Sequence, residues 1–326
     1  MRKLYCLLIL LTSVQGSSAQ DPHFSQFYAS PTMLNPALTG AGLCGGRVAL
    51  NYRNQWPSIP NNYKTFAAAY DQYAPRVNSG FGIQMAQDIA GDGLLTTRQV
   101  GVSYAYRVPL GKKWNMQFAM QGTWIQRSLD FSRLYFADQI VAQKGFILTT
   151  SELLPNESIN FPSLSSGAVV FSEKFFAGFS AHHMNQPYQS FYGNSGPGTT
   201  LPTRFTLHGG LKLGGSKRNV QESWTFSPNI LLMLQGAFTE MNLGFYASKN
   251  GFTGGLWFRQ SGATSDALIL LAGYTWTNFR MGYSYDATVS SARLVARSSH
   301  EISLAYTFCS SPKQGRKPKG DICPSF

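Results

Sequence analysis

The two apolar stretches nearest the C-terminal end, residues 279–286 and 301–308, alternate strictly between apolar and polar side chains. A period of two predicts β-strands, whose successive side chains point to opposite faces. The apolar face comprises Phe279, Met281, Tyr283, Tyr285, Ile302, Leu304, Tyr306 and Phe308. A soluble β-sandwich also shows this period, but here aromatic rings lie at the strand ends and the other face carries Arg, Asp and Glu. An apolar outer face and a polar inner face are typical of a transmembrane β-barrel, so we predict that this hairpin closes one.

The same alternation recurs upstream and predicts further strands. Residues 47–53, for example, alternate Arg and Asn with Val, Leu and Tyr. Segments 164–171 and 175–183 alternate poorly, which leaves their registers open. We found no linker or shift in composition that would divide the chain into domains. We therefore predict an all-β fold, a single antiparallel outer-membrane barrel of about fourteen strands over residues 46–308, with a polar or plugged lumen.

The predicted connections fall into two classes by length. With an even number of strands, alternate connections lie at opposite ends of the barrel and both chain ends return to one side. The longer connections are 54–63, 88–97, 125–163, 183–202 and 287–299. The shorter ones are 72–79, 108–114, 172–174, 214–223, 248–251 and 276–278. Because such barrels have long extracellular loops and short periplasmic turns, we predict an outer-membrane location of a Gram-negative type with both termini periplasmic.

The N-terminal residues predict export. Residues 1–19 contain a charged start, an apolar core and a small-residue cleavage site, which together indicate a secretory signal peptide and a mature chain beginning at Gln20. After Ala19 no stretch approaches the roughly 18–20 uncharged apolar residues of a spanning helix. Residues 20–45 contain three X-Pro breaks and no sustained period, so we expect an N-terminal lead-in or plug.

Residues 309–326 form a basic, proline-containing tail that we expect to be periplasmic and not to span the membrane. Export to an oxidising compartment permits a disulfide between Cys309 and Cys323, which would leave Cys44 as the odd cysteine. No Cys-x-x-Cys pair or set of spaced histidines indicates a metal site.

The net charge of +12 raises the question of nucleic-acid binding. We disfavour it because the Arg and Lys residues are spread singly along the strands and concentrate only in the tail. The alternation instead places a set of charged side chains inside the barrel. The candidate lumen-lining residues are Arg53, Asp71, Arg107, Arg204, His208, Lys212, Glu240, Arg259, Arg280, Asp286 and Glu301. A polar lumen explains them more simply than a specific ligand pocket.

We expect neither a metal nor a cofactor, and no catalytic residues. The pair His182–His183 is adjacent in sequence, so on a strand the two rings would point to opposite faces and could not hold one ion. Residues 88–93 lack the spaced carboxylates and final Glu of a calcium loop, and residues 193–198 do not form a nucleophile elbow. No Walker loop or dinucleotide fingerprint is present.

Several sequence blocks follow one another along nearly the whole predicted mature chain. They are HFSQFYASPTMLNPALTG (23–40), YRNQWPSI (52–59), YKTFAAAYDQ (63–72), LDFSRLYFADQI (129–140), AHHMNQPYQSF (181–191), GYSYDATVS (282–290) and SSHEISL (298–304). In these blocks the chain resembles the PorP/SprF family of type IX secretion system membrane proteins. The extension after residue 308 departs from the family pattern, which leaves its role open.

The resemblance implies a component of the type IX secretion system that supports the export or surface attachment of specific large, adhesin-type cargo proteins. The partners it implies are the secreted cargo and periplasmic components of the machinery, in addition to outer-membrane lipid. Neither nucleic acid nor a small-molecule substrate is expected. The alternative is a passive porin or solute transporter, which a polar lumen also permits, and an enzyme barrel is a weaker third reading. Ion conduction would separate a porin from a plugged anchor.

Overall fold

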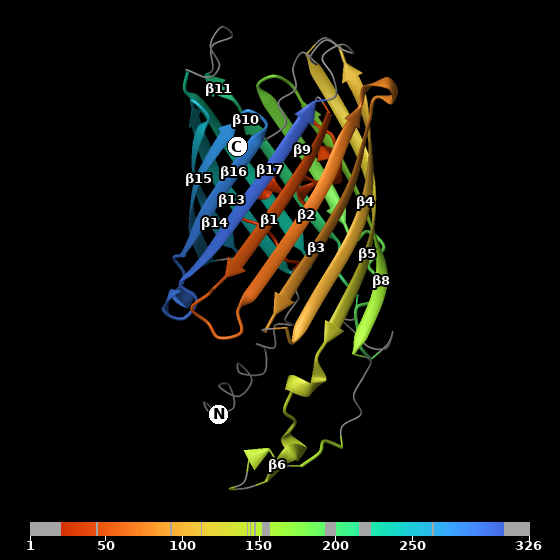
Figure 1. Ribbon diagram of the computed structural model, residues 1–326, viewed down its shortest axis with the longest axis vertical. Helices are drawn as coiled ribbons and strands as arrows, with labels where there is room; N and C mark the ends of the chain where they lie inside the picture. The colour runs from red at the N-terminus through yellow and green to blue at the C-terminus, as the bar shows by residue number, and fades with distance from the viewer. Residues whose placement is uncertain are drawn as a thin grey trace, which may run out of the picture.

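The computed structural model describes residues 21–43, 45–91, 93–111, 113–141, 143, 145–146, 148–151, 157–192, 200–214, 223–262 and 264–309. Fourteen antiparallel strands close into a barrel (Figure 1). They are β1 (Gly45–Gln55), β2 (Tyr63–Ala74), β3 (Ser79–Ala90), β4 (Leu95–Leu110), β5 (Trp114–Leu129), β8 (Ser158–Phe171), β9 (Phe175–His182), β10 (Arg204–Leu211), β12 (Thr225–Gln235), β13 (Phe238–Lys249), β14 (Phe252–Ser261), β15 (Thr264–Trp276), β16 (Phe279–Thr288) and β17 (Ser298–Cys309). The fold class and strand number predicted from alternation are thus confirmed.

Two strand pairings complete the ring. β1 pairs with β17 in a register that sets Leu50 opposite Leu304, and β10 pairs with β12. The short β11 (Leu213–Gly214) follows β10 and also pairs with β12. Every strand of the ring therefore has a hydrogen-bonded neighbour on both edges, as a barrel requires.

The outward side chains of the strands are large, apolar and exposed. Leu50 is 47% exposed and Val102 60% exposed, and the aromatic residues Trp114 and Trp276 lie at strand ends. Exposed apolar side chains on this scale are unfavourable in water, whereas hydrocarbon accepts them. The outer surface thus suits a bilayer. Among the described residues, no helix is both long enough and apolar enough to cross a membrane.

The long connections between β1 and β2, β5 and β8, β9 and β10, and β16 and β17 lie at one end of the barrel, the long-loop end (Figure 1). Short turns join β3 to β4, β12 to β13 and β14 to β15 at the same end. The connection between β5 and β8 extends well away from the barrel and contains η4 (Phe131–Arg133), η5 (Ala137–Gln139) and the small hairpin of β6 (Ile140–Val141) and β7 (Gly145–Phe146). Both flanking strands run farther into this connection than the alternation predicted. Within it, hydrogen bonds led by the Ser151 N–H hold the pKa of Asp138 below its usual range. The opposite end has short turns, such as η3 (Pro75–Val77) between β2 and β3.

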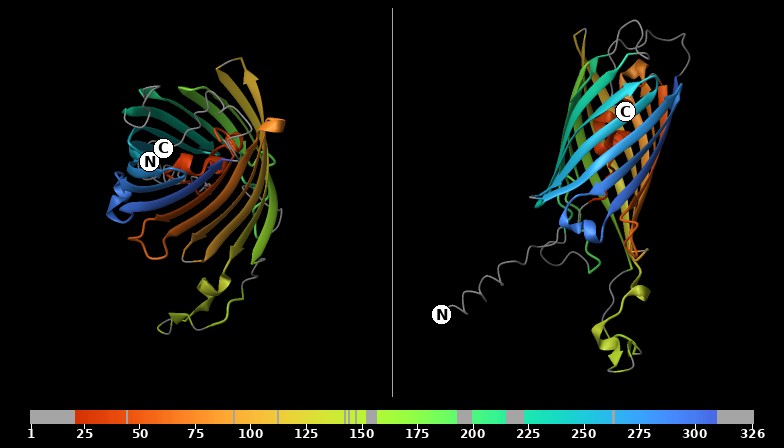
Figure 2. Two further views of the ribbon diagram at one scale, coloured as in Figure 1. Left: turned by 45° about the horizontal axis from the view of Figure 1, so that its top comes forward. Right: turned by 90° about the vertical axis from the view of Figure 1, so that its left-hand side faces the viewer.

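Residues 21–43, hereafter the plug, lie inside the barrel as the red segment that the strands surround in Figure 2. The plug contains η1 (Phe27–Ala29), α2 (Pro31–Leu34) and η2 (Pro36–Leu38). α2 and η2 both begin at proline, whose fixed φ suits the first helical position. The plug is therefore a series of short turns, consistent with its lack of a sustained period.

The plug brings apolar side chains into the lumen. The Phe27 ring meets Trp257 edge to face at 5.2 Å, and the Tyr28 ring meets Phe176 at 5.6 Å. Inward residues of the barrel wall, including Leu231 and Ile269, are fully buried in the same core. The lumen is thus filled by a mixed apolar and polar core, which is the plugged form of the predicted polar or plugged lumen.

The first and last described residues lie at opposite ends of the barrel. The Asp21 N–H donates to Gln235, which stands beside the turn at the long-loop end, whereas β17 ends at Cys309 among the short turns. As expected for an even number of strands, the start of β1 and the end of β17 lie at the same end of the barrel. Residue 21 lies at the opposite end, contrary to that expectation, because the plug runs lengthwise through the lumen before β1 begins. The signal peptide, Cys44, Cys323 and the tail after Cys309 lie outside the described residues.

Candidate functional site

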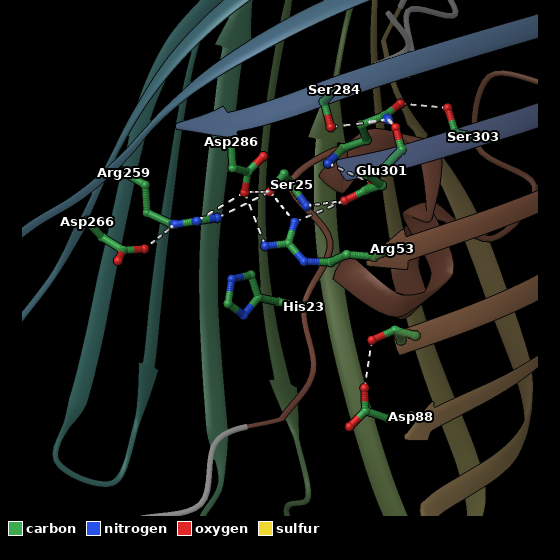
Figure 3. A network of polar contacts seen from close by, with 12 residues as sticks. His23, Ser25, Arg53, Asp88, Arg259, Asp266, Ser284, Asp286, Glu301 and Ser303 are labelled. Atoms are coloured by element: carbon green, nitrogen blue, oxygen red, sulfur yellow. Dashed lines mark hydrogen bonds and ion pairs between the residues drawn. The ribbon is translucent and has the colours of Figure 1, made fainter. Parts of the chain in front are cut away.

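Near the long-loop end, five charged side chains from neighbouring strands form a charged cluster: Arg53 of β1, Arg259 of β14, Asp266 of β15, Asp286 of β16 and Glu301 of β17 (Figure 3). Arg53 contacts Asp286 at 3.1 Å and Glu301 at 3.2 Å. Arg259 contacts Asp286 at 3.1 Å and Asp266 at 2.7 Å. Arg53, Asp286 and Glu301 are each 1% exposed, so this cluster is stable only because each charge has partners.

The plug supplies some of those partners. Glu301 accepts hydrogen bonds from two plug N–H groups, that of Ser25 at 2.7 Å and that of Gln26 at 3.0 Å. The Ser25 hydroxyl donates to Asp286 at 2.5 Å and accepts a hydrogen bond from Arg53. The Gln26 side chain in turn accepts from the Ser303 hydroxyl at 2.6 Å. The charged cluster therefore fastens the plug to β1, β16 and β17.

A second anchor holds the plug near the short-turn end. Arg47 donates two hydrogen bonds to Asp71, at 2.9 and 2.8 Å, and Asp71 also accepts from the Gly40 N–H at 2.7 Å. Bidentate arginine–carboxylate pairs are among the stronger polar contacts in proteins. Arg107 donates to the Gly40 carbonyl at 3.2 Å and stacks on the Tyr73 ring at 3.9 Å.

Between the two anchors, Asn35 ties the plug to β8 and β9. Its side-chain amide donates to the carbonyls of Ala168 and Phe179, both at 3.2 Å, and its oxygen accepts from the Ala37 N–H. Gly167 makes this approach possible because a Cβ there would lie 2.0 Å from the Asn35 oxygen. The plug is thus anchored at three levels along the barrel axis.

The predicted lumen-lining residues occupy different environments. Eight of them are buried: Arg53, Asp71, Arg107, His208, Glu240, Arg259, Asp286 and Glu301. Four belong to the charged cluster, and Asp71 and Arg107 belong to the second anchor. Arg204 is partly buried and contacts Asp21 at 3.1 Å. Lys212, between β10 and β11, and Arg280 of β16 are also partly buried.

Sequence reasoning did not identify the plug residues that complete the anchors, namely Ser25, Gln26, Asn35 and Gly40. It also left Arg47 out of the lumen set, although the alternation placed Arg47 on the inner face. No spacing in the sequence links residue 25 to residue 301. The available signal was the repeated polar and small residues around the three X-Pro breaks of residues 20–45.

The two adjacent histidines require a correction. β9 ends at His182, and His183 follows with a positive φ of 56°, so the strand rule of opposite faces no longer applies. His182 contacts the Leu34 carbonyl at 3.3 Å, and His183 contacts Asp21 at 2.7 Å. Both rings therefore face the plug. Within the described residues, no group of three potential metal ligands lies close together.

A closed barrel with an apolar outer face and an internal plug defines the class: this is an outer-membrane-type β-barrel protein with an occluded lumen. Residues 16–306 match the family model for the type IX secretion system membrane protein PorP/SprF, so the chain belongs to the PorP/SprF family. This is a family of secretion-system membrane proteins and not a family of enzymes. The predicted family and its type IX assignment are therefore confirmed.

Solved structures with the same general architecture have low sequence identity to this chain. The toluene transporter TodX of P. putida is 10% identical to this chain. The alignment covers 85% of this chain and 93% of the TodX chain, with a TM-score of 0.48. Omp33 of Acinetobacter baumannii is 8% identical, covers 81% of this chain and 98% of its own, and aligns with a TM-score of 0.44. A search of curated proteins found no match.

Proposed function

We propose that this protein is a fixed, occluded outer-membrane component of the type IX secretion machinery that supports the export or surface attachment of specific large cargo proteins. The observation that carries the proposal is the plug, which three separate anchors hold inside the barrel. Membership of the PorP/SprF family supports secretion-system partners in general. Because the lumen is closed, the barrel would contact its secretion partners through its two ends and its loops.

A passive porin fits the lumen less well. A solute path along the axis would have to pass the core of Phe27, Tyr28 and Trp257, in addition to the charged cluster. Opening that path would leave Asp286 and Glu301 without the N–H and hydroxyl donors of the plug. Breaking buried charge contacts of this kind costs several kcal/mol, about 3–5 when one ionic partner is lost.

The proposed orientation places the long loops outside the cell and the short turns in the periplasm. The asymmetry of loop length supports it. In this orientation the end of β17 leads into the basic tail on the periplasmic side, where exposed positive charges attract acidic surfaces in a salt-dependent way. The tail is then the segment best placed to contact periplasmic components.

Cysteine labelling tests this orientation in a background whose other mature cysteines are serine. Tyr192→Cys lies in the long connection between β9 and β10, where the native side chain is 74% exposed. Asn250→Cys lies in the short turn between β13 and β14. We expect an impermeant maleimide to label the first variant in intact cells and the second only after lysis. Labelling of Asn250→Cys alone in intact cells would invert the orientation.

Complementation tests the function. A strain lacking this protein should lose one or a few cargo proteins from its surface while other type IX cargo persists, and the wild-type gene should restore them. A variant without residues 310–326 should insert as a heat-modifiable barrel but co-purify less periplasmic machinery. Unchanged surface cargo in the deletion strain would contradict the proposed function. Unchanged partners in the truncated protein would contradict the role of the tail alone.

A further inference from the structure

A cavity of about 430 Å³ lies beside the plug, and we call it the vestibule. Most of the barrel wall around it comes from β2 to β5 and β8, with single residues of β1, β9 and β12 and two of β10. Trp56, Tyr63, Gln189 and Leu201 line it at the long-loop end. No residue of the charged cluster lines the vestibule. In Figure 3, Asp88, which does line it, stands apart from that cluster. The volume of the vestibule falls within the range of about 300–1,000 Å³ typical of small-molecule sites.

The concavity of the wall arises from small inward residues. The strand registers set Gln84 of β3, Gly101 of β4 and Thr123 of β5 side by side. A Cβ on Gly101 would lie 2.9 Å from both the Thr123 hydroxyl and the Gln121 amide nitrogen. The absence of a side chain at Gly101 therefore lets neighbouring amide and hydroxyl groups form the cavity wall.

Two amides of this wall have unused hydrogen-bonding capacity. Gln84 and Gln121 are 7% and 3% exposed, and within the described part of the chain no group donates a hydrogen bond to their side-chain oxygens. Buried polar atoms without a partner are uncommon, which points to a ligand that provides one. Because an amide both donates and accepts, a pair of them suits a hydroxyl group, which does the same. Gln99 and Thr123 add further neutral groups.

The charges that line the vestibule balance one another. Asp21 pairs with Arg204 at 3.1 Å, while Asp88 accepts from the Thr65 hydroxyl at 2.6 Å. Arg127 donates to Gln189 at 2.5 Å. Two carboxylates and two guanidinium groups line the vestibule, so their charges cancel. The site therefore favours a neutral ligand over an anion or a cation.

Aromatic side chains complete the chemistry. Trp56 and Tyr63 meet edge to face at 5.8 Å, and Phe161 lines the wall on β8. Flat apolar rings beside amides and hydroxyls suit a pyranose, which has apolar C–H faces and a rim of hydroxyl groups. A peptide would usually add to a free strand edge, but each strand of this barrel is already paired on both edges.

We propose that the vestibule is a binding site for a neutral saccharide of one or two units, reached from the long-loop end. The amides of Gln84 and Gln121 hold its hydroxyl groups, and the rings near the mouth cover an apolar face of the sugar. The inference rests on the cavity alone. It stands or fails independently of the role in secretion.

The test is isothermal titration of the full-length protein in detergent with maltose, cellobiose and N-acetylglucosamine. We expect saturable binding of at least one of these sugars. Gln84→Leu and Gln121→Leu should each weaken that binding about tenfold or more, equivalent to about 1.4 kcal/mol. Gln87→Leu is the matched control, because residue 87 lies on the same strand with the opposite orientation.

Heat-modifiability shows whether each variant folds. If the leucine variants do not fold, Gly101→Ala, whose methyl group would enter the wall beside Gln121, should weaken binding instead. No saturable heat with any of the three sugars, or equal losses for Gln84→Leu and Gln87→Leu, would overturn the proposal. Binding of trialanine in place of all three sugars would also overturn it.

Discussion

At the scale of single residues, the lumen combines buried charge with close backbone packing. Arg53 is nearly fully buried and contacts two of the three carboxylates of the charged cluster, Asp286 and Glu301. Gly80 of β3 lies so close to the plug that a Cβ there would be 2.2 Å from the Thr39 carbonyl oxygen. These two positions therefore test the polar contacts and the close packing between the plug and the barrel wall.

Replacing Arg53 with methionine should lower the free energy of unfolding by about 3–5 kcal/mol, because Glu301 and Asp286 would remain buried with fewer positive partners. Urea unfolding of vesicle-embedded protein, followed by tryptophan fluorescence, measures this. Arg98→Met is the control, since Arg98 is exposed and makes one long contact with Gln126 at 3.4 Å; its effect should stay within about 0.5 kcal/mol. Adding Glu301→Gln should recover part of the Arg53→Met loss. Equal effects of the two arginine variants would contradict the cluster's structural role.

Gly80→Ala should destabilise the plugged barrel by about 1–3 kcal/mol, because the new methyl group overlaps the plug backbone. Gly122→Ala provides the matched control, since nothing lies within 4 Å of a Cβ placed there. It should change stability by no more than about 0.5 kcal/mol. The same unfolding assay compares them. If Gly80→Ala is as stable as Gly122→Ala, the plug does not pack against β3 as described.

At the scale of elements, alternation predicted the strands where the two faces differ in polarity and was weaker where they do not. β12 contains the run 230–234, in which Leu231 and Met233 point into the core while Ile230 and Leu234 face outward. Such a strand is apolar on both faces because the plug provides an inner apolar surface. The period of two is then hidden, as also in β15.

The candidate site was predictable only in part. Alternation placed Arg53 and Glu301 on the inner face of their strands, but their contact depends on the β1–β17 register, in which they stand directly opposite. Those strands are separated by nearly the whole chain, and no local pattern specifies that register. The contribution of Ser25 was equally hidden, because the plug is positioned by tertiary contacts and not by a repeating pattern.

Leu50→Arg should impair barrel assembly. Leu50 lies midway along β1 on the outer face, where a cation near the bilayer midplane costs about 2–4 kcal/mol. Leu294→Arg makes the same change in η6 (Ser291–Leu294), where the side chain is 79% exposed in a loop, and should be tolerated. The measured quantity is the heat-modifiable folded fraction in outer membranes. Equal yields for the two variants would show that the outer face of β1 does not meet lipid.

At the scale of the whole molecule, the barrel and its plug form one core. The inner apolar residues of the wall pack on Phe27, Tyr28 and Leu38. The buried carboxylates of β2 and β17 accept hydrogen bonds from plug N–H groups, and that of β16 accepts one from the Ser25 hydroxyl. Removing the plug would expose apolar wall and uncompensated charge together. The central claim is therefore that the folded protein has a closed lumen.

Planar-bilayer conductance measures that claim most directly, with full-length protein compared with a variant that lacks residues 21–43. Insertion of each is verified by heat-modifiability of the reconstituted protein. The account predicts no stepwise conductance for the intact protein and stepwise openings for the variant without the plug. Stable, open-channel conductance from the intact, folded protein would contradict it and favour the porin reading.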